Sequence, residues 1–223
     1  MSFNVAIDGP AGAGKSTVAK AVAAKRNFIY VDTGAMYRTM ALYFLRKGVD
    51  KNDEAAVNKA CMEVSISIAY ENGAQQVFLN GENVSGLIRT EEVGNMASAT
   101  SGYLFVREKL VELQKEMARK SDVVMDGRDI GTVVLPDAEV KVFLTASAEE
   151  RARRRMLELE ERGTPEPYAA ILRAIQERDW NDTHRDAAPL RQAEDAVLLD
   201  TTALDFVQSE DALLHIIRER TGL

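Results

Sequence analysis

The residues best suited to chemistry form a short glycine-rich segment near the start of the chain. The segment Gly9-Pro10-Ala11-Gly12-Ala13-Gly14-Lys15-Ser16-Thr17 fits the pattern G-x-x-x-x-G-K-[ST]. Glycine and alanine leave backbone N–H groups open to phosphate, and a helix starting near Lys15 points the positive end of its dipole at the same anion. The Lys15 ammonium can contact the β- and γ-phosphates, and the Ser16 hydroxyl can bind Mg²⁺. The spacing predicts a site for a nucleoside triphosphate with Mg²⁺.

The flanking sequence supports this prediction. The apolar run 3–8 precedes the segment, and a helical pattern follows it over 18–23. Strand, glycine-rich turn and helix is the context in which this motif binds phosphate. The competing interpretation, a turn rich in glycine and alanine that matches by chance, does not require that context.

Four further apolar runs, 28–31, 123–125, 140–144 and 196–199, each end in polar residues. Alternation of such runs with helical patterns predicts an α/β fold of the P-loop NTPase class, with a five-stranded, mostly parallel sheet flanked by helices. Ligands bind beyond the carboxyl ends of such strands, where Asp8, Asp32, Asp126 and Asp129 are expected to lie. Any one of these aspartates could equally be a turn former or a helix cap.

The stretch between the second and third of these strands is longer than a crossover needs, so it predicts an insertion. Residues 64–70 alternate, Asn72-Gly73 marks a turn, and 76–79 resume the alternation, which indicates a small antiparallel sheet. Helices are expected over 91–99 and 103–119. We therefore expect a core domain of 1–38, 106–147 and 165–223, an acceptor-binding insertion of 39–105 and a short helical lid of 148–164.

The predicted lid carries a run of arginines. Ser147 and Glu150 form a capping-box pattern that starts a helix. At about 100° per residue, Arg151, Arg154 and Arg155 share a face, and Arg153 points away. The run could close on phosphates, or it could pair with the helix's own acids, which are Glu158, Glu160 and Glu161.

The next predicted helix, 167–185, has one face that changes from apolar to charged residues along its length. Its apolar stripe consists of Tyr168, Ile171, Leu172 and Ile175. The same face continues into Arg178, Asp182 and Arg185. Charges on an inward face need partners, so this pattern favours an anionic, hydroxyl-bearing ligand. A structural ion-pair network is the alternative.

The composition limits which partners, compartments and metal sites we expect for this protein. The net charge of −7 argues against a nucleic-acid partner. The single cysteine, Cys61, excludes an internal disulfide and is expected to be buried in a helix. No apolar run approaches the roughly 20 residues of a membrane span, and no signal peptide is evident, so we expect a cytoplasmic protein. His184 and His215 are too isolated for a metal site, and the absence of a long exposed apolar patch favours a monomer.

Several classes of protein bind triphosphates. The Asn-Lys-x-Asp signature of GTPases is absent, and the chain is too short and acidic for a typical nucleic-acid motor. Two lobes around a phosphate loop suit a kinase that closes over two small substrates and excludes water. A kinase for a different small molecule, such as a sugar acid or a coenzyme precursor, and a non-catalytic ATP-binding module remain open.

Several segments together resemble the bacterial cytidylate kinase family, over residues 3 to about 202. The segments are the phosphate loop, Asp32-Thr33-Gly34-Ala35-Met36-Tyr37-Arg38, residues 86–93, residues 126–134, residues 149–151, residues 177–179, and Asp182, Arg185 and 188–190. The resemblance implies a transferase of pyrimidine nucleotide metabolism that passes the γ-phosphoryl group of ATP to CMP or dCMP, with Mg²⁺.

The resemblance also implies residue roles. Lys15, Arg128 and Arg178 would be catalytic. Gly9 to Thr17, with Arg151 and Arg155 from the lid, would bind ATP, and Ser16 would bind the metal. The acceptor phosphate would be clamped by Arg38, Arg128 and Arg178, and the cytosine edge would be read by Ser98, Arg107 and Asp129. Tyr37 would pack nearby, Thr33 would contact CMP, and Asp182 and Arg185 would contact the ribose.

Overall fold

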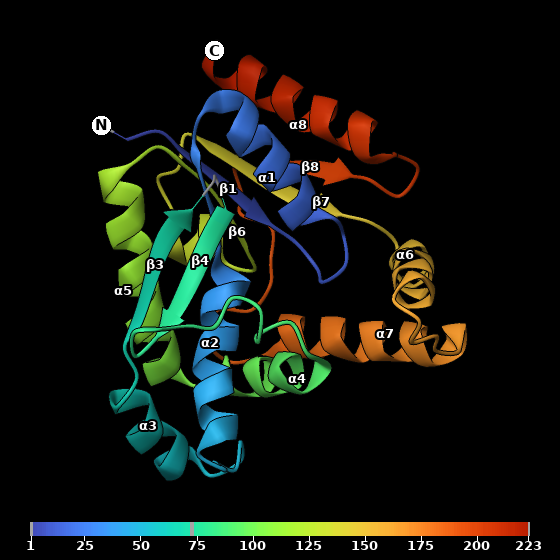
Figure 1. Ribbon diagram of the computed structural model, residues 1–223. Helices are drawn as coiled ribbons and strands as arrows, with labels where there is room; N and C mark the ends of the chain where they lie inside the picture. Colours follow the sequence, from blue (N-terminus) through green and yellow to red (C-terminus); the bar gives the residue numbers. More distant parts are fainter. Residues whose placement is uncertain (1, 72–73, 223) are drawn as a thin grey trace. The chain divides into compact units, whose positions relative to one another are not determined.

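The computed structural model describes residues 2–71 and 74–222 (Figure 1). The chain divides into two compact units. The first consists of the residues up to Tyr30 and those from Ser121 onward, and the second is Val31–Lys120. The second unit contains the whole of the insertion predicted over 39–105. The finer division into core, insertion and lid stays a prediction.

A five-stranded sheet has the strand order β2-β6-β1-β7-β8, and all of it except the last two residues of β2 belongs to the first unit. The strands are β1 (Asn4–Asp8), β2 (Ile29–Asp32), β6 (Val123–Gly127), β7 (Val140–Thr145) and β8 (Val197–Asp200). Strand β1 pairs in parallel with β6 and β7, and β7 pairs in parallel with β8. The predicted α/β fold with a five-stranded parallel sheet is confirmed.

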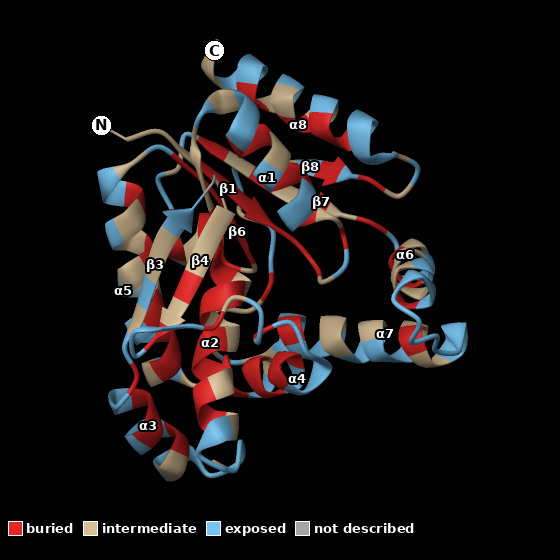
Figure 2. Cartoon of the chain, in the orientation of Figure 1, coloured by how far each residue is buried: buried red, intermediate tan, exposed pale blue. Residues whose placement is uncertain are grey.

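Four α-helices and one π-helical turn complete the first unit. They are α1 (Lys15–Arg26), α6 (Ala148–Glu161), α7 (Tyr168–His184), α8 (Phe206–Thr221) and the π-helix η1 (Ile130–Val134). Residues of α1, α8 and the sheet share one buried apolar cluster, and Figure 2 draws most of β1 in the colour of buried residues. The last helix begins at Phe206, where Asp205 and Gln208 form a capping box.

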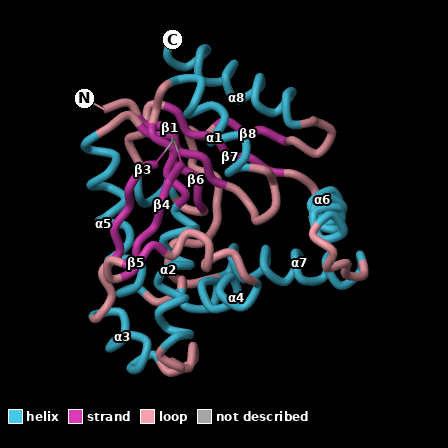
Figure 3. Tube along the Cα trace, in the orientation of Figure 1, coloured by secondary structure: helices cyan, strands magenta, loops and turns pink. Residues whose placement is uncertain are grey.

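The second unit combines a small sheet with helices. Its helices are α2 (Thr33–Arg46), α3 (Glu54–Met62), α4 (Glu91–Thr100) and α5 (Leu104–Lys120), and its strands are β3 (Ile66–Glu71), β4 (Ala74–Leu79) and β5 (Glu82–Asn83). The strand order is β3-β4-β5, as the tube in Figure 3 shows. Strands β3 and β4 are antiparallel, which confirms that prediction. The expected turn at Asn72-Gly73 lies outside the described residues.

Helix α2 is the centre of the second unit. Its residues Met36, Met40 and Phe44 are fully buried in a cluster that also contains Val77 and Leu79 of β4. This shared core explains why α2 belongs to the same compact unit as the inserted sheet. Cys61 is buried in α3, as predicted. Among the described residues, no helix is long and apolar enough to cross a membrane.

Candidate functional site

The glycine-rich loop links β1 to α1 and depends on backbone shapes that favour glycine. Gly9 has φ +147°, and a Cβ there would lie 1.9 Å from the carbonyl oxygen of Leu144. Gly14 is the N-cap of α1 with φ +89°. Because glycine has no side chain to cap the helix, the first N–H groups of α1 face no capping oxygen from it. The loop therefore leaves the helix start open to an anion.

Lys15 lies inside this loop. Its ammonium donates to the carbonyl oxygens of Gly9 and Pro10 at 2.8 and 2.7 Å. Burial, reinforced by the positive charge of Arg128, lowers the pKa of Lys15 to about 7. A polyanion bound beside Lys15 would favour its charged form.

Ser16, in the first turn of α1, contacts an acid from a neighbouring strand. Its hydroxyl donates to Asp126 Oδ2 at 2.9 Å, and the Tyr30 hydroxyl donates to Asp126 Oδ1 at 2.8 Å. The sequence placed Asp126 at a strand end without giving it a metal role. The signal that could have found it is strand order, since β6 lies beside β1 in the sheet.

Asp8, at the end of β1, anchors the segment after β6. Its two carboxylate oxygens accept from the backbone N–H groups of Ile130 and Gly131, each at 2.7 Å. Burial outweighs these hydrogen bonds and raises the pKa of Asp8 to about 6. The contact fixes the start of η1, directly after Arg128 and Asp129.

The predicted inward face of α7 meets those two residues in a charged cluster. Arg128 Nε donates to Asp182 Oδ2 at 2.9 Å, and Arg185 Nη2 lies 3.8 Å from Asp129 Oδ1. Burial alone would raise the pKa of Asp182, but Arg128, with help from Arg178 and Arg185, holds that pKa below its usual value. Three guanidinium groups thus act on the Asp182 carboxylate, and such a group of cations suits an anionic ligand.

The arginines of α6 have different partners. The Arg151 side chain is 5% exposed and forms a two-bond pair with Asp179, at 2.9 and 2.6 Å. It also donates to the carbonyl oxygens of Ala146 and Ala11, and Ala11 belongs to the phosphate loop. Arg155 is half-exposed and pairs with Glu158 at 2.8 Å. Of the two arginines predicted to bind ATP, Arg151 therefore holds the phosphate loop in place, whereas Arg155 lies on the surface.

The remaining predicted residues lie in the second unit. Thr33, Tyr37 and Arg38 come from the first turns of α2, Ser98 from α4 and Arg107 from α5. A Cβ on Gly34 would lie 3.8 Å from Arg38 Nη1, and one on Gly94 would lie 4.0 Å from Arg38 Nε, so the Arg38 guanidinium runs back along α2 beside α4.

Arg107 connects α5 with α2 and the end of α4. Its guanidinium carbon lies 5.9 Å from the ring centre of Tyr37, and its Nη1 is 3.5 Å from the Ser101 carbonyl oxygen. The Ser101 hydroxyl donates in turn to the carbonyl oxygen of Ser98. The structure therefore brings Tyr37 and Arg107 close to the end of α4 that carries Ser98.

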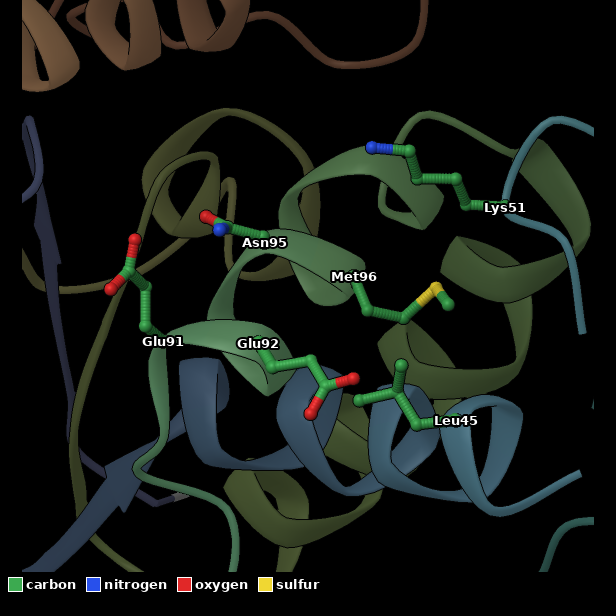
Figure 4. Close-up of a pocket in the computed structure, with 6 residues that line it drawn as sticks. All are labelled: Leu45, Lys51, Glu91, Glu92, Asn95 and Met96. Atoms are coloured by element: carbon green, nitrogen blue, oxygen red, sulfur yellow. The ribbon is translucent and has the colours of Figure 1, made fainter. Parts of the chain in front are cut away.

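A pocket of about 540 Å³ lies elsewhere in the second unit (Figure 4). It is lined by Leu45 of α2, Lys51 of the following loop, and Glu91, Glu92, Asn95 and Met96 of α4. Among the described residues, none of those predicted to bind ATP or CMP lines it. The pocket thus contributes nothing to the predicted chemistry.

Comparison with known proteins identifies relatives across nearly the whole chain. A family model described as "Cytidylate kinase" matches residues 5–219. A cytidylate kinase of Lactobacillus johnsonii is 49% identical over 218 residues, covering 98% of this chain and 95% of the relative. One of Bacillus licheniformis is 47% identical over 217 residues, covering 97% and 96%. A crystal structure of an uncharacterized protein from Eubacterium ventriosum matches 97% of this chain and 98% of its own with a TM-score of 0.53 at 12% identity, a likeness of fold alone.

Proposed function

The chain belongs to the cytidylate kinase family, and from this premise we propose that it transfers the γ-phosphoryl group of ATP to CMP or dCMP. The observation that carries the proposal is the cluster of Arg128, Arg178 and Arg185 around Asp182 in the unit that also holds the phosphate loop. A triphosphate loop alone needs no such second group of cations. A kinase with a phosphorylated acceptor does, because both substrates are anions.

The reaction needs positioning and charge compensation more than a base. An anionic phosphate oxygen of CMP attacks the γ-phosphorus, the bond from that phosphorus to the ADP oxygen breaks, and ADP leaves. Because the attacking oxygen carries no proton, no side chain has to remove one. Lys15 and the arginines offset the charge that spreads over the transferred group.

We assign the donor and acceptor contacts as the family pattern implies. Gly9 to Thr17 bind the ATP phosphates, and Arg155 closes on them from the lid. Arg151, whose guanidinium already contacts Ala11, acts on the same phosphates through the loop. Arg38, Arg128 and Arg178 hold the acceptor phosphate, and Asp182 and Arg185 hold its ribose.

Cytosine selection falls to Ser98, Arg107 and Asp129, with Tyr37 and Thr33 beside them. Cytosine donates a hydrogen bond through its exocyclic amine, whereas uracil presents an oxygen at the same place. A carboxylate such as Asp129 accepts from the amine but repels the oxygen, so it favours cytosine.

The donor atoms at the phosphate loop suit Mg²⁺. The Ser16 hydroxyl and the Asp126 carboxylate lie 2.9 Å apart, and both are hard oxygen ligands. Within the described residues, no cluster of three or more His, Cys, Asp or Glu side chains could hold a metal. Magnesium bound mainly through phosphates and water fits this donor set, where it would neutralise the charge of the β- and γ-phosphates.

The test of the proposed function is ADP formation in a coupled assay. ATP and Mg²⁺ are supplied with CMP, dCMP, UMP, AMP or shikimate, and each rate is compared with that of ATP alone. CMP and dCMP should give the highest rates. The proposal fails if CMP gives no more ADP than the control without acceptor, and a high rate with shikimate alone would indicate a different small-molecule kinase.

Base selection has its own test. Replacing Asp129 by alanine removes the group that accepts from the cytosine amine and repels the uracil oxygen. We expect Asp129→Ala to lower the preference for CMP over UMP, measured as the ratio of kcat/KM, by about tenfold to a hundredfold. An unchanged ratio would remove Asp129 from this role.

We also infer a monomer that works in the cytoplasm. A single buried cysteine suits a reducing compartment, and both substrates are small cytoplasmic metabolites. Sedimentation of the purified protein at assay concentration measures the oligomeric state, and a dimer there would overturn that part of the inference.

A further inference from the structure

Gln75 of β4 is a polar residue on the face of the inserted sheet that packs against α2. In β4, alternate residues share a face, so Gln75 lies on the same face as Val77 and Leu79. Those two residues are 2% and 3% exposed and belong to the core formed with α2. Gln75 is therefore the polar end of an otherwise apolar stripe of β4.

The Gln75 amide binds the main chain of a single residue. Its Oε1 accepts from the N–H of Asp32 at 2.8 Å, and its Nε2 donates to the carbonyl oxygen of Asp32 at 3.2 Å. This is the exchange of two hydrogen bonds that a residue of a paired strand would make. Only a side-chain amide of this length carries both the acceptor and the donor that it requires.

Asp32 is fixed through its side chain as well. It is the N-cap of α2, where Oδ1 accepts from the N–H of Ala35 at 2.9 Å. Its Oδ2 pairs with Arg89 at 2.5 Å, and Arg89 comes from the segment after β5. The insertion therefore holds both the backbone and the carboxylate of the residue at which α2 begins.

The end of α2 held in this way carries acceptor-side residues. Thr33 follows Asp32 directly, and the Arg38 guanidinium lies back along the helix at Gly34. A change in the direction of the first turn would move both groups together. A displacement of about 1 Å is enough to cost a kinase much of its rate, because catalysis here depends on position.

We propose that Gln75 is a positioning residue, through which the inserted sheet sets the N-terminus of α2 in the geometry that receives the acceptor nucleotide. The inference rests on the proposed function and deepens it, because it gives the inserted sheet a task in acceptor binding. Gln75 itself touches neither substrate in this account. Its effect passes through Asp32 to Thr33 and Arg38.

The chain offers a matched control at the next position. Gln76 is the same residue type on the same strand but lies on the opposite face, where its Oε1 accepts from Asn83 at 3.1 Å among exposed groups. We expect Gln75→Leu to raise the KM for CMP about tenfold, since two partly buried hydrogen bonds are lost, with the KM for ATP unchanged. Gln76→Leu should leave both constants at their wild-type values.

A second variant and a second measurement cover loss of folding. Gln75→Glu is nearly isosteric but replaces the donor with an oxygen that faces the Asp32 carbonyl, so the KM for CMP should rise here too. Amide hydrogen exchange without substrate should be faster at Asp32 and Ala35 in both Gln75 variants than in Gln76→Leu. Exchange and KM values equal to those of Gln76→Leu would overturn the proposal. Failure of the proposed function would show separately, as wild-type protein that does not turn over CMP.

Discussion

Helices α6 and α7 each carry several arginines, but the two helices use them differently. On α6, Arg153 and Arg154 pair with Glu150 of the same helix and lower its pKa to about 2. Arg154 also donates to the carbonyl oxygens of Thr201 and Leu204. Arg151 is occupied by Asp179 and by two main-chain oxygens. Most of these guanidinium groups already have partners within the fold.

On α7 the inward charges belong to a shared cluster. Arg178 and Arg185 both act on the buried Asp182, which Arg128 already contacts. Three arginines from two segments act on one buried carboxylate there, and guanidinium groups gathered in this way suit a phosphate. An arginine run in a sequence therefore says little until its partners are known, and the cluster shared between segments is the better candidate for a substrate site.

The largest expected effect comes from removing a cation of the α7 cluster. Arg178→Ala should lower kcat by about a hundredfold, or about 2.7 kcal/mol in barrier height, because the acceptor phosphate loses a charged contact. The loss should be similar with CMP and with UMP, since the phosphate is common to both. Steady-state assays with each acceptor measure it.

The matched control is Arg173→Ala on the same helix. Arg173 is exposed and donates to the Ala169 carbonyl oxygen of its own helix. Its removal should leave kcat within twofold of wild type. Equal losses of kcat in the two variants would mean that the charges of α7 act on stability alone. The arginines of α6 and α7 would then not differ in role.

The next effect tests α6 as a brace. Arg151→Ala leaves Asp179 without its cation and two main-chain oxygens without a donor, which should cost about 2 kcal/mol of stability. For a chain of this size the melting temperature should fall by roughly 4 to 8 °C. The KM for ATP should also rise, because the guanidinium that holds the Ala11 carbonyl is gone.

Arg153→Ala is the control for this variant, since Arg153 is exposed and pairs only along its own helix. Thermal unfolding followed by circular dichroism should place it within about 1 °C of wild type. Arg151→Ala could have the same melting temperature as Arg153→Ala and yet a raised KM for ATP. That result would mean that Arg151 contacts the phosphates directly and that α6 is a lid rather than a brace.

Much of this site could be predicted from local pattern. The phosphate loop, the parallel sheet and the inward face of α7 follow from spacing and periodicity alone, since each is a property of a few neighbouring residues. The same reasoning found Arg178, Asp182 and Arg185 as a set. What it could not decide was which partners that set and the α6 run have within the fold.

Contacts between distant segments were beyond its reach. Asp126 meets Ser16 because β6 lies next to β1, and strand order is not written in either segment. Asp8 holds η1 across a similar distance in sequence, and a π-helix has no pattern that marks it. Gln75 looked like an ordinary strand residue until its partner, Asp32, was known.

The smallest expected effect asks whether the α7 cluster reaches the phosphate loop. Arg128 is the main charge that lowers the pKa of Lys15, after burial, to about 7 in the free protein. At pH 8 Lys15 is then mostly neutral, and a bound triphosphate restores its charge, so ATP binding should take up a proton and weaken several-fold from pH 7 to 8.5. Calorimetry at pH 8 in Tris and in HEPES, which differ in ionisation enthalpy, measures the uptake.

Arg128→Ala should reduce the uptake, because Lys15 keeps more of its charge before ATP arrives, and Arg153→Ala should leave it unchanged. Equal uptake in the two variants would mean that the cluster and the loop are electrostatically separate.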